Sequence, residues 1–186
     1  TRDITRAEAG YPGTGSAFVF DRTYLFSTPN PATQPALSSL LVKAAQPPTS
    51  NNPANAQTYD SYIDTSGRLH CLYALQDATT GYSFTNRHAI IENGVVTFDG
   101  PAPISFINHA RIIQDDQGRF YLISMNAGSL FVNRAAAGDT NGTSFEGQQT
   151  ITLNPAFSGG GHGFSIAAPR GGTPRAAFVD IRYQAN

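Results

Sequence analysis

The sequence predicts an all-β protein built from a repeated unit, and three observations support this prediction. The chain of 186 residues contains 18 glycines and 12 prolines, and it is 40% hydrophobic but only 13% charged, which is typical of a globular, turn-rich domain. Short apolar runs alternate with turn motifs, and no segment from residue 57 onward has helical periodicity. An Asp-x-x-Gly-Arg turn followed by an apolar run occurs twice, about 50 residues apart.

The two copies of this turn are Asp64–Arg68 and Asp115–Arg119. In the second copy, Ala110–Ile113 precedes the turn and Phe120–Ile123 follows it, so the segment is predicted to be a β-hairpin. Aspartate tolerates tight turns, and the glycine supplies a positive φ angle. A looser third copy begins with the apolar run His162–Ile166.

Residues 1–56 are predicted to form an irregular N-terminal segment with one hairpin and a proline-rich loop. The hairpin would consist of Ala17–Phe20 and Thr23–Phe26, joined at Asp21 and Arg22. Ala36–Ala45 has the composition of either a short helix or an outer strand, and Gln46–Ala56 is predicted to be loop.

Residues 57–186 are predicted to form successive units at about 57–105, 106–157 and 158–186, the last one partial. Each unit pairs the Asp-x-x-Gly-Arg hairpin with an outer hairpin. In the first unit Asn93 and Gly94 join the outer strands, and this dipeptide selects a type I′ turn. In the second unit the outer strands would be Leu130–Asn133 and Thr150–Leu153.

A four-stranded repeat of about 50 residues is typical of β-propeller blades. At that length the chain holds three to four antiparallel blades, whereas propellers have about four to eight. The final strand, Asp180–Tyr183, would be the second strand of a blade. We therefore expect an incomplete ring, which further residues or other chains would complete.

Polar residues at the starts of the innermost strands are the first candidates for a site. This position is Thr58 or Tyr59 in the first unit, His109 in the second and His162 in the third, and equivalent blade positions converge at one mouth of a propeller. The alternative is that these residues only satisfy backbone groups at blade edges. His88 could reach the same mouth or lie on the surface of a strand; alternation places it and Ile90 on one face and Arg87 on the other.

Two further residues are predicted to be structural. His70 and Cys71 lie in the middle of an apolar strand, Leu69–Leu72, where Cys71 is expected to be buried and His70 to have a structural role. Cys71 is the only cysteine, so no internal disulfide can form.

With these residues in place, the units resemble sialidase-like (BNR-type) propeller repeats. The Asp-x-x-Gly-Arg turn, preceded by a short strand that opens with Asn108 and His109, is similar to propeller polysaccharide lyases of the ulvan lyase or rhamnose–glucuronate lyase type. The resemblance covers residues 57–183. The chain departs from sialidases because it has no tryptophan and because Ser61–Gly67 matches their Asp-box motif only in part.

The resemblance implies cleavage of a uronate-containing polymer by β-elimination. In that family two histidines, a tyrosine and an arginine neutralise the uronate carboxylate, abstract the C5 proton and protonate the leaving oxygen. His88 and His109 match the paired histidines in order and spacing, and are the candidate catalytic residues. The candidate substrate-binding residues are Tyr59, Arg87, Asn108, His162 and Arg182, with Arg175 an alternative source of the guanidinium.

The scheme requires no cofactor or metal, and the histidines and carboxylates lack metal-ligand spacing. Asp139–Gly142 could bind calcium, but its composition favours a turn. The net charge of −1 and the single lysine, Lys43, argue against nucleic acid as a partner. No apolar run is long enough to span a membrane.

We therefore expect a secreted enzyme whose partner is a polysaccharide or another glycan. A non-catalytic propeller that binds glycans or proteins, or a structural cell-surface module, is the alternative. A sialidase-like glycoside hydrolase is a third possibility, and it would require an acidic pair near the channel. Asp60, Asp64 and Asp180 are scattered in the sequence and do not suggest such a pair.

Overall fold

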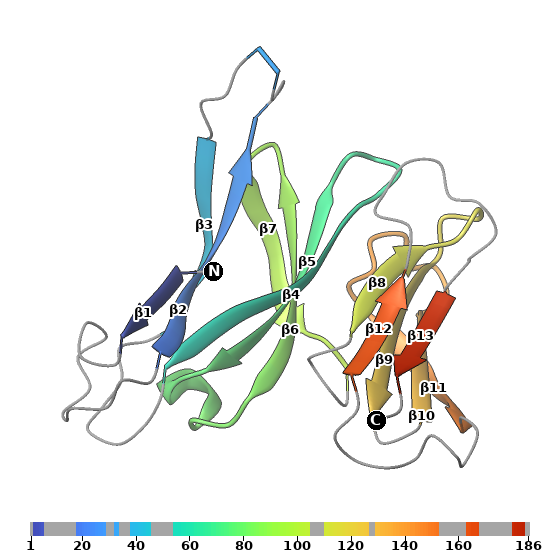
Figure 1. Ribbon diagram of the computed structural model, residues 1–186. Helices are drawn as coiled ribbons and strands as arrows, with labels where there is room; N and C mark the ends of the chain where they lie inside the picture. Colours follow the sequence, from blue (N-terminus) through green and yellow to red (C-terminus); the bar gives the residue numbers. More distant parts are fainter. Residues whose placement is uncertain are drawn as a thin grey trace.

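The computed structural model describes residues 2–5, 18–28, 32–33, 38–45, 54–104, 110–126, 129–152, 163–167 and 180–184. In these residues the chain is all-β, as predicted, and the one helical element is a short 3-10 turn, η1 (Ala78–Thr80). Figure 1 shows the strands grouped into separate sheets that follow one another along the chain.

Four antiparallel sheets contain these strands. The first sheet has the order β1 (Arg2–Thr5), β2 (Phe18–Ser27), β3 (Ser38–Ala44). The second sheet has the order β4 (Asn55–Ile63), β5 (Leu69–Gln76), β6 (Thr85–Glu92), β7 (Val95–Pro101). The third sheet consists of β8 (Arg111–Gln114), β9 (Phe120–Asn126), β10 (Ser129–Ala135) and β11 (Phe145–Thr152). The fourth pairs β12 (Gly163–Ala167) with β13 (Asp180–Gln184).

The two Asp-x-x-Gly-Arg turns have the same hydrogen bonds. In each turn the aspartate amide donates to the arginine carbonyl at 2.9 Å, and the glycine amide donates to the aspartate carbonyl at 3.0 Å. Oδ1 of Asp64 accepts from the amide of Arg68, and Oδ1 of Asp115 from the amide of Arg119, both at 2.8 Å. Gly67 and Gly118 have φ angles of 81° and 79°, a region that favours glycine. The predicted repeat is therefore present as matching local structure.

The hairpin between β6 and β7 also has the predicted turn. Asn93 and Gly94 have φ angles of 50° and 76°. Positive φ at both central residues defines a type I′ turn, whose twist suits a two-residue hairpin.

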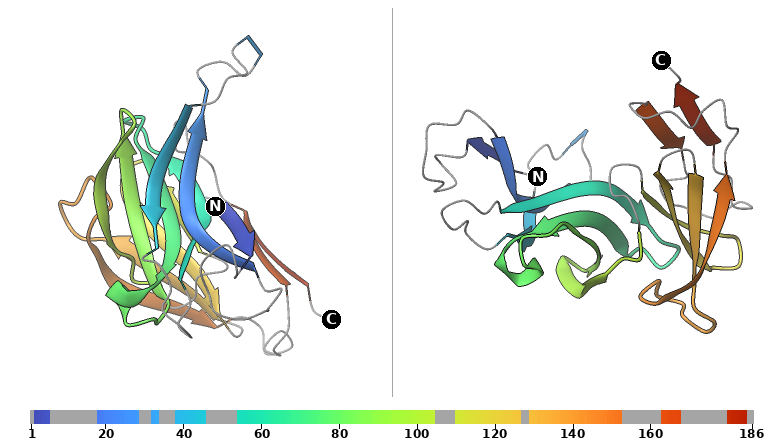
Figure 2. Two further views of the ribbon diagram at one scale, coloured as in Figure 1. Left: turned by 90° about the vertical axis from the view of Figure 1, so that its left-hand side faces the viewer. Right: turned by 90° about the horizontal axis from the view of Figure 1, so that it is seen from below.

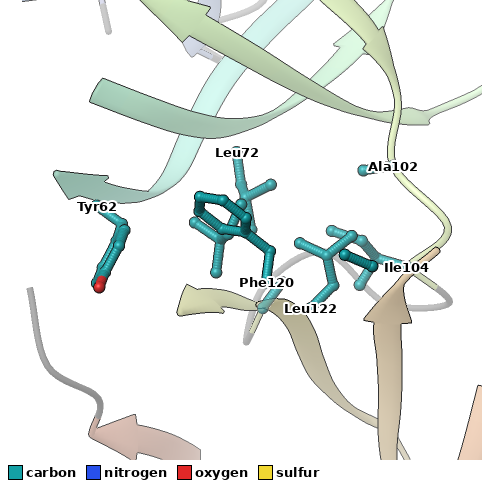
Figure 3. Close-up of a cluster of buried hydrophobic side chains, with 9 residues drawn as sticks. Tyr62, Leu72, Ala102, Ile104, Phe120 and Leu122 are labelled. Atoms are coloured by element: carbon teal, nitrogen blue, oxygen red, sulfur yellow. The ribbon is translucent and has the colours of Figure 1, made fainter. Parts of the chain in front are cut away.

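The second sheet lies between the first and the third, and both of its faces are buried (Figures 1 and 2). One face, which includes Tyr73 and Ala89, packs against Leu25, Leu40 and Val42 of the first sheet. The other face packs against the third sheet, and Figure 3 shows this cluster. Its labelled members are Tyr62, Leu72, Ala102, Ile104, Phe120 and Leu122.

The first strands of the second and third sheets, β4 and β8, lie next to each other. The backbone amide of Ile112 in β8 donates to Oδ2 of Asp60 in β4 at 3.0 Å. Asp60 is buried, so this bond is shielded from water and fixes how one sheet sits on the next.

The N-terminal hairpin differs from the prediction. β2 continues through Asp21 and Arg22 without a turn and pairs with β1 on one side and β3 on the other. Asp-Arg lacks the glycine or asparagine that a two-residue hairpin needs, and pairing on both edges satisfies more backbone groups. Ser38–Ala44, within the segment predicted as helix or strand, is a strand.

Candidate functional site

A buried chain of three titratable residues lies between the second and third sheets. His88 in β6 places Nε2 2.9 Å from Nδ1 of His70 in β5. Nε2 of His70 lies 3.2 Å from Oδ2 of Asp64, in the turn between β4 and β5. His70 is fully buried and His88 is 1% exposed, so this Asp64–His70–His88 network is closed to solvent.

Asp64 is the charged end of this network. Burial alone would raise the pKa of the Asp64 carboxyl, but hydrogen bonds from the Arg68 amide and from His70, together with the Arg68 guanidinium, lower it below its usual range. Nε of Arg68 donates to Oδ2 of Asp64 at 2.7 Å. Asp64 is therefore ionised near neutral pH and acts only as an acceptor.

Both histidines are neutral at the same pH. Burial lowers the pKa of His70, although Asp64 opposes the shift. Burial is the main cause that lowers the pKa of His88 to about 3, and the neighbouring His70 is the second. The Gly142 backbone and more distant carboxylates oppose this shift with smaller effects. A buried ring without a compensating charge keeps its neutral form.

These protonation states fix the direction of each hydrogen bond. Because Asp64 can only accept, the Nε2–H group of His70 donates to it. Nδ1 of His70 then accepts from the Nε2–H group of His88. Nδ1 of His88 remains an acceptor and has no hydrogen-bond partner of normal geometry among the described residues, although the nearby Gly142 backbone would favour a proton on the ring.

Aromatic side chains surround the two rings. The His70 ring lies 4.6 Å from that of Phe120, and the His88 ring lies 5.7 Å from Phe98 and 6.4 Å from Phe145, measured between centroids. A general base must reach the proton that it removes. The described structure gives a polymer no access to His88, so its catalytic role stays a prediction and the geometry favours a structural role.

Arg87 lies on the opposite face of β6 from His88, as strand alternation predicts. Its Nε donates to Oδ1 of Asp99 at 2.8 Å and lies 3.1 Å from the Tyr73 hydroxyl. Lys43 donates to Oδ2 of the same carboxylate at 3.0 Å. The structure therefore does not bring Arg87 and His88 to one site. Arg87 instead pairs with Asp99, and this carboxylate also binds Lys43 of the first sheet.

Tyr59 lies beside an irregularity in the pairing of β4 with β5, between Thr58 and Asp60. Its hydroxyl donates to Oε1 of Gln57 at 2.9 Å, and the side chain is half-buried. Burial raises the pKa of Tyr59 to about 12, so the phenol stays protonated. The hydrogen bond of this hydroxyl goes to Gln57 and to neither of the two buried histidines.

Three predicted site residues, Asn108, His109 and His162, lie outside the described residues. Arg182 belongs to β13, where its backbone is opposite Ser165 of β12. The predicted convergence of Tyr59, His109 and His162 on one pocket therefore stays a prediction.

The Asp64–His70–His88 network was not predicted, although a signal for it existed. His88 is opposite Leu72 in the pairing of β5 with β6, so alternation places His70 on the same face. The register between β5 and β6 makes the two histidines diagonal neighbours. This register could not be read from the sequence.

Arg68 connects the network to the third sheet. Its Nη1 donates to Oδ1 of Asn141 at 2.6 Å and its Nη2 to the carbonyl of Thr140 at 3.3 Å. The turn that carries these two residues is organised by Asp139, whose carboxylate accepts from the amides of Asn141 and Thr143 at 2.8 and 2.7 Å. Asp139–Gly142, which was predicted to be a turn, is one. Among the described residues no cluster of three metal-ligating side chains occurs.

Neither a protein-family model nor a curated protein nor a solved structure matches this chain. Within the described part of the chain, no helix has the length and apolar character needed to cross a bilayer. What the geometry defines directly is thus an all-β protein of stacked antiparallel sheets with a closed polar network between two of them.

Proposed function

We propose that this chain forms part of a β-propeller. The supporting observation concerns two successive four-stranded sheets. Each contains the same kind of Asp-x-x-Gly-Arg turn, the two sheets pack face to face, and their first strands, β4 and β8, lie side by side. Blades that follow each other around a propeller axis have this arrangement. The β12–β13 pair would be the inner part of the next blade.

We further propose that the protein is a secreted polysaccharide lyase that cleaves a uronate-containing polymer by β-elimination. The observation that carries this proposal is the contact between β4 and β8, the first strands of their sheets. In the sequence His109 stands two residues before Arg111, where β8 begins, and a propeller would bring this end of the strand near its axis. Ligands of propellers bind at the mouth of that axis, and the resemblance to propeller lyases gives a histidine at this place a role in proton transfer.

The proposed chemistry requires two things of the site. The carbanion formed at C5 is stable only if the adjacent carboxylate is neutralised by cationic or hydrogen-bonding groups, a role for Arg182, Asn108 and the protonated Tyr59. The C5 proton needs a base that titrates near neutrality, which His109 or His162 supplies; as the C4–O bond breaks, the histidinium so formed returns a proton to the leaving glycosidic oxygen. His88 has no role in this proposal, because its ring is buried.

The test is incubation with pectate, alginate and glucuronan while following the ultraviolet absorbance of the unsaturated uronate product. His109→Ala is expected to abolish the absorbance increase. His88→Gln, which removes a buried histidine, is the matched control and is expected to retain it in the folded fraction. If no uronate polymer yields product with the unmodified chain, the lyase proposal is wrong.

A non-catalytic propeller that binds a glycan or protein is the second candidate. The burial of His88 favours it, since one of the two predicted catalytic histidines is held in the core. Binding of a uronate polymer without any product would support this candidate against the lyase. A glycoside hydrolase is not proposed, because Asp60 and Asp64 are engaged in buried hydrogen bonds with backbone amides and side chains.

A further inference from the structure

Two hollows adjoin each other on the third sheet, and Arg134 lines both. The first, of about 320 Å³, lies between the β8–β9 turn and the segment 134–140 that leads out of β10. The second, of about 410 Å³, lies over β9, β10 and β11, and Tyr121, Val132, Glu146 and Gln149 line it. Volumes of this size accommodate small ligands. Because Arg134 lines both hollows, we call the two together the Arg119–Arg134 groove.

Arg119 is an exposed cation at one end of the groove. In the first copy of the turn, the equivalent Arg68 donates to Oδ2 of its aspartate at 2.7 Å. In the second copy the hydroxyl of Tyr121 donates to Oδ2 of Asp115 at 3.0 Å and takes that place. The side chain of Arg119 also hydrogen-bonds that of Tyr121, but among the described residues no carboxylate forms an ion pair with it, so its charge can still meet a carboxylate on a ligand.

Arg134 is held only weakly by the protein. Its Nη2 lies 3.3 Å from Oε1 of Glu146, and the two side chains are 50% and 48% exposed. Exposed ion pairs of this kind contribute little to stability, so a carboxylate on a ligand can compete for the guanidinium. Asp139 also lines the groove, but its carboxylate accepts hydrogen bonds from the amides of Asn141, Thr143 and Ser144.

The remaining lining suits a sugar. Gln148 and Gln149 offer amide groups that donate and accept hydrogen bonds, as sugar hydroxyls require. Tyr121 contributes an aromatic ring with a polar end, a side chain common in sites that bind partly apolar ligands.

We propose that the Arg119–Arg134 groove binds an acidic oligosaccharide, with the two guanidinium groups directed to its carboxylates. Arginine matches carboxylates with two parallel donors, which gives such a site geometric selectivity. The site is separate from the proposed axial site of elimination, and the inference does not depend on catalysis.

The test is titration calorimetry of the whole chain with a short oligogalacturonate and with a neutral cello-oligosaccharide of equal length. The acidic ligand is expected to bind, and more weakly as salt is added, because salt screens exposed charges. Arg119→Ala and Arg134→Ala are each expected to weaken binding about tenfold, the effect of losing one charge-assisted hydrogen bond. Glu146→Gln, the matched control, removes a competing carboxylate and is expected to leave binding equal or tighter.

The neutral sugar binding as tightly as the acidic one would overturn the proposal, as would unchanged affinity in the Arg119→Ala/Arg134→Ala double variant. Weaker binding by Glu146→Gln would also contradict it. Unfolding of each variant in urea confirms that the fold persists, since both arginines are exposed. Elimination measured on both proteins separates the two sites. Lost binding with retained product in the double variant supports a groove that is separate from the site of elimination. Binding without any product in the unmodified chain supports the groove while the lyase proposal fails.

Discussion

The Asp64–His70–His88 network should make this protein sensitive to acid in a pH range set by His88. The ordinary pKa of histidine is 6.5, and that of His88 in the folded chain is about 3. As the pH falls below 6.5, the unfolded chain takes up a proton that the folded chain excludes. The folded state therefore loses stability between these two values, and keeps the full contribution of His88 above 6.5.

The size of the effect follows from the two pKa values. Each pH unit between them costs the folded state up to about 1.4 kcal/mol, so the contribution of His88 falls by about 2–3 kcal/mol between pH 7 and pH 4.5. The lowered pKa of His70 acts in the same direction. A loss of this size is a substantial part of the stability of an ordinary domain, about 5–15 kcal/mol.

Urea unfolding at pH 7 and pH 4.5 measures the effect, with His88→Gln as the comparison. Glutamine has no titratable group but keeps an N–H donor for Nδ1 of His70. The variant is expected to be less stable at pH 7 but to lose about 2–3 kcal/mol less on acidification. Equal losses in the two proteins would refute the reasoning, as would a nuclear magnetic resonance titration in which the His88 ring protonates near pH 6 in the folded chain.

Three other predictions concern single positions. Gly142→Ala should destabilise the fold by about 2–4 kcal/mol in urea unfolding, because φ is 67° and the new Cβ would lie 2.8 Å from Cγ of the fully buried Phe120; a loss below 1 kcal/mol would contradict this. The Cys71 thiol, buried and with its pKa raised to about 12 by that burial, should react with a disulfide reagent only after unfolding. Asp64→Asn should cost about 2–3 kcal/mol, more than Asp115→Asn, because only Asp64 has buried charged and histidine partners.

Sequence reasoning was most successful where structure is local. The Asn93-Gly94 turn and the turns that begin at Asp64 and Asp115 depend on a few adjacent residues whose backbone preferences decide the outcome. Their strands, and the opposite faces assigned to Arg87 and His88, followed from the period of two along a strand. The all-β class could therefore be predicted.

The reasoning was less successful where the outcome depends on distant parts of the chain. The environment of the two histidines depends on the register between β5 and β6 and on the third sheet, which places Phe145 beside the His88 ring and Phe120 beside the His70 ring. The turn predicted at Asp21 does not form, because pairing of β2 on both edges overrides a weak local signal. Neither effect is contained in the residues on which the prediction was based.

The contact between β4 and β8 bears on how such a protein can evolve by duplication. Asp60 and Arg111 hold the same place relative to the turn aspartates Asp64 and Asp115, yet one is an acid and the other a base. Across the joint between the sheets, Asp60 faces Nε of Arg111 at 3.9 Å as well as the amide of Ile112. Two copies of either sheet would set like charges against each other at this joint. Duplication of one unit would therefore cost stability unless one of the two charges changed, and the present order of the two sheets is the one that pairs opposite charges.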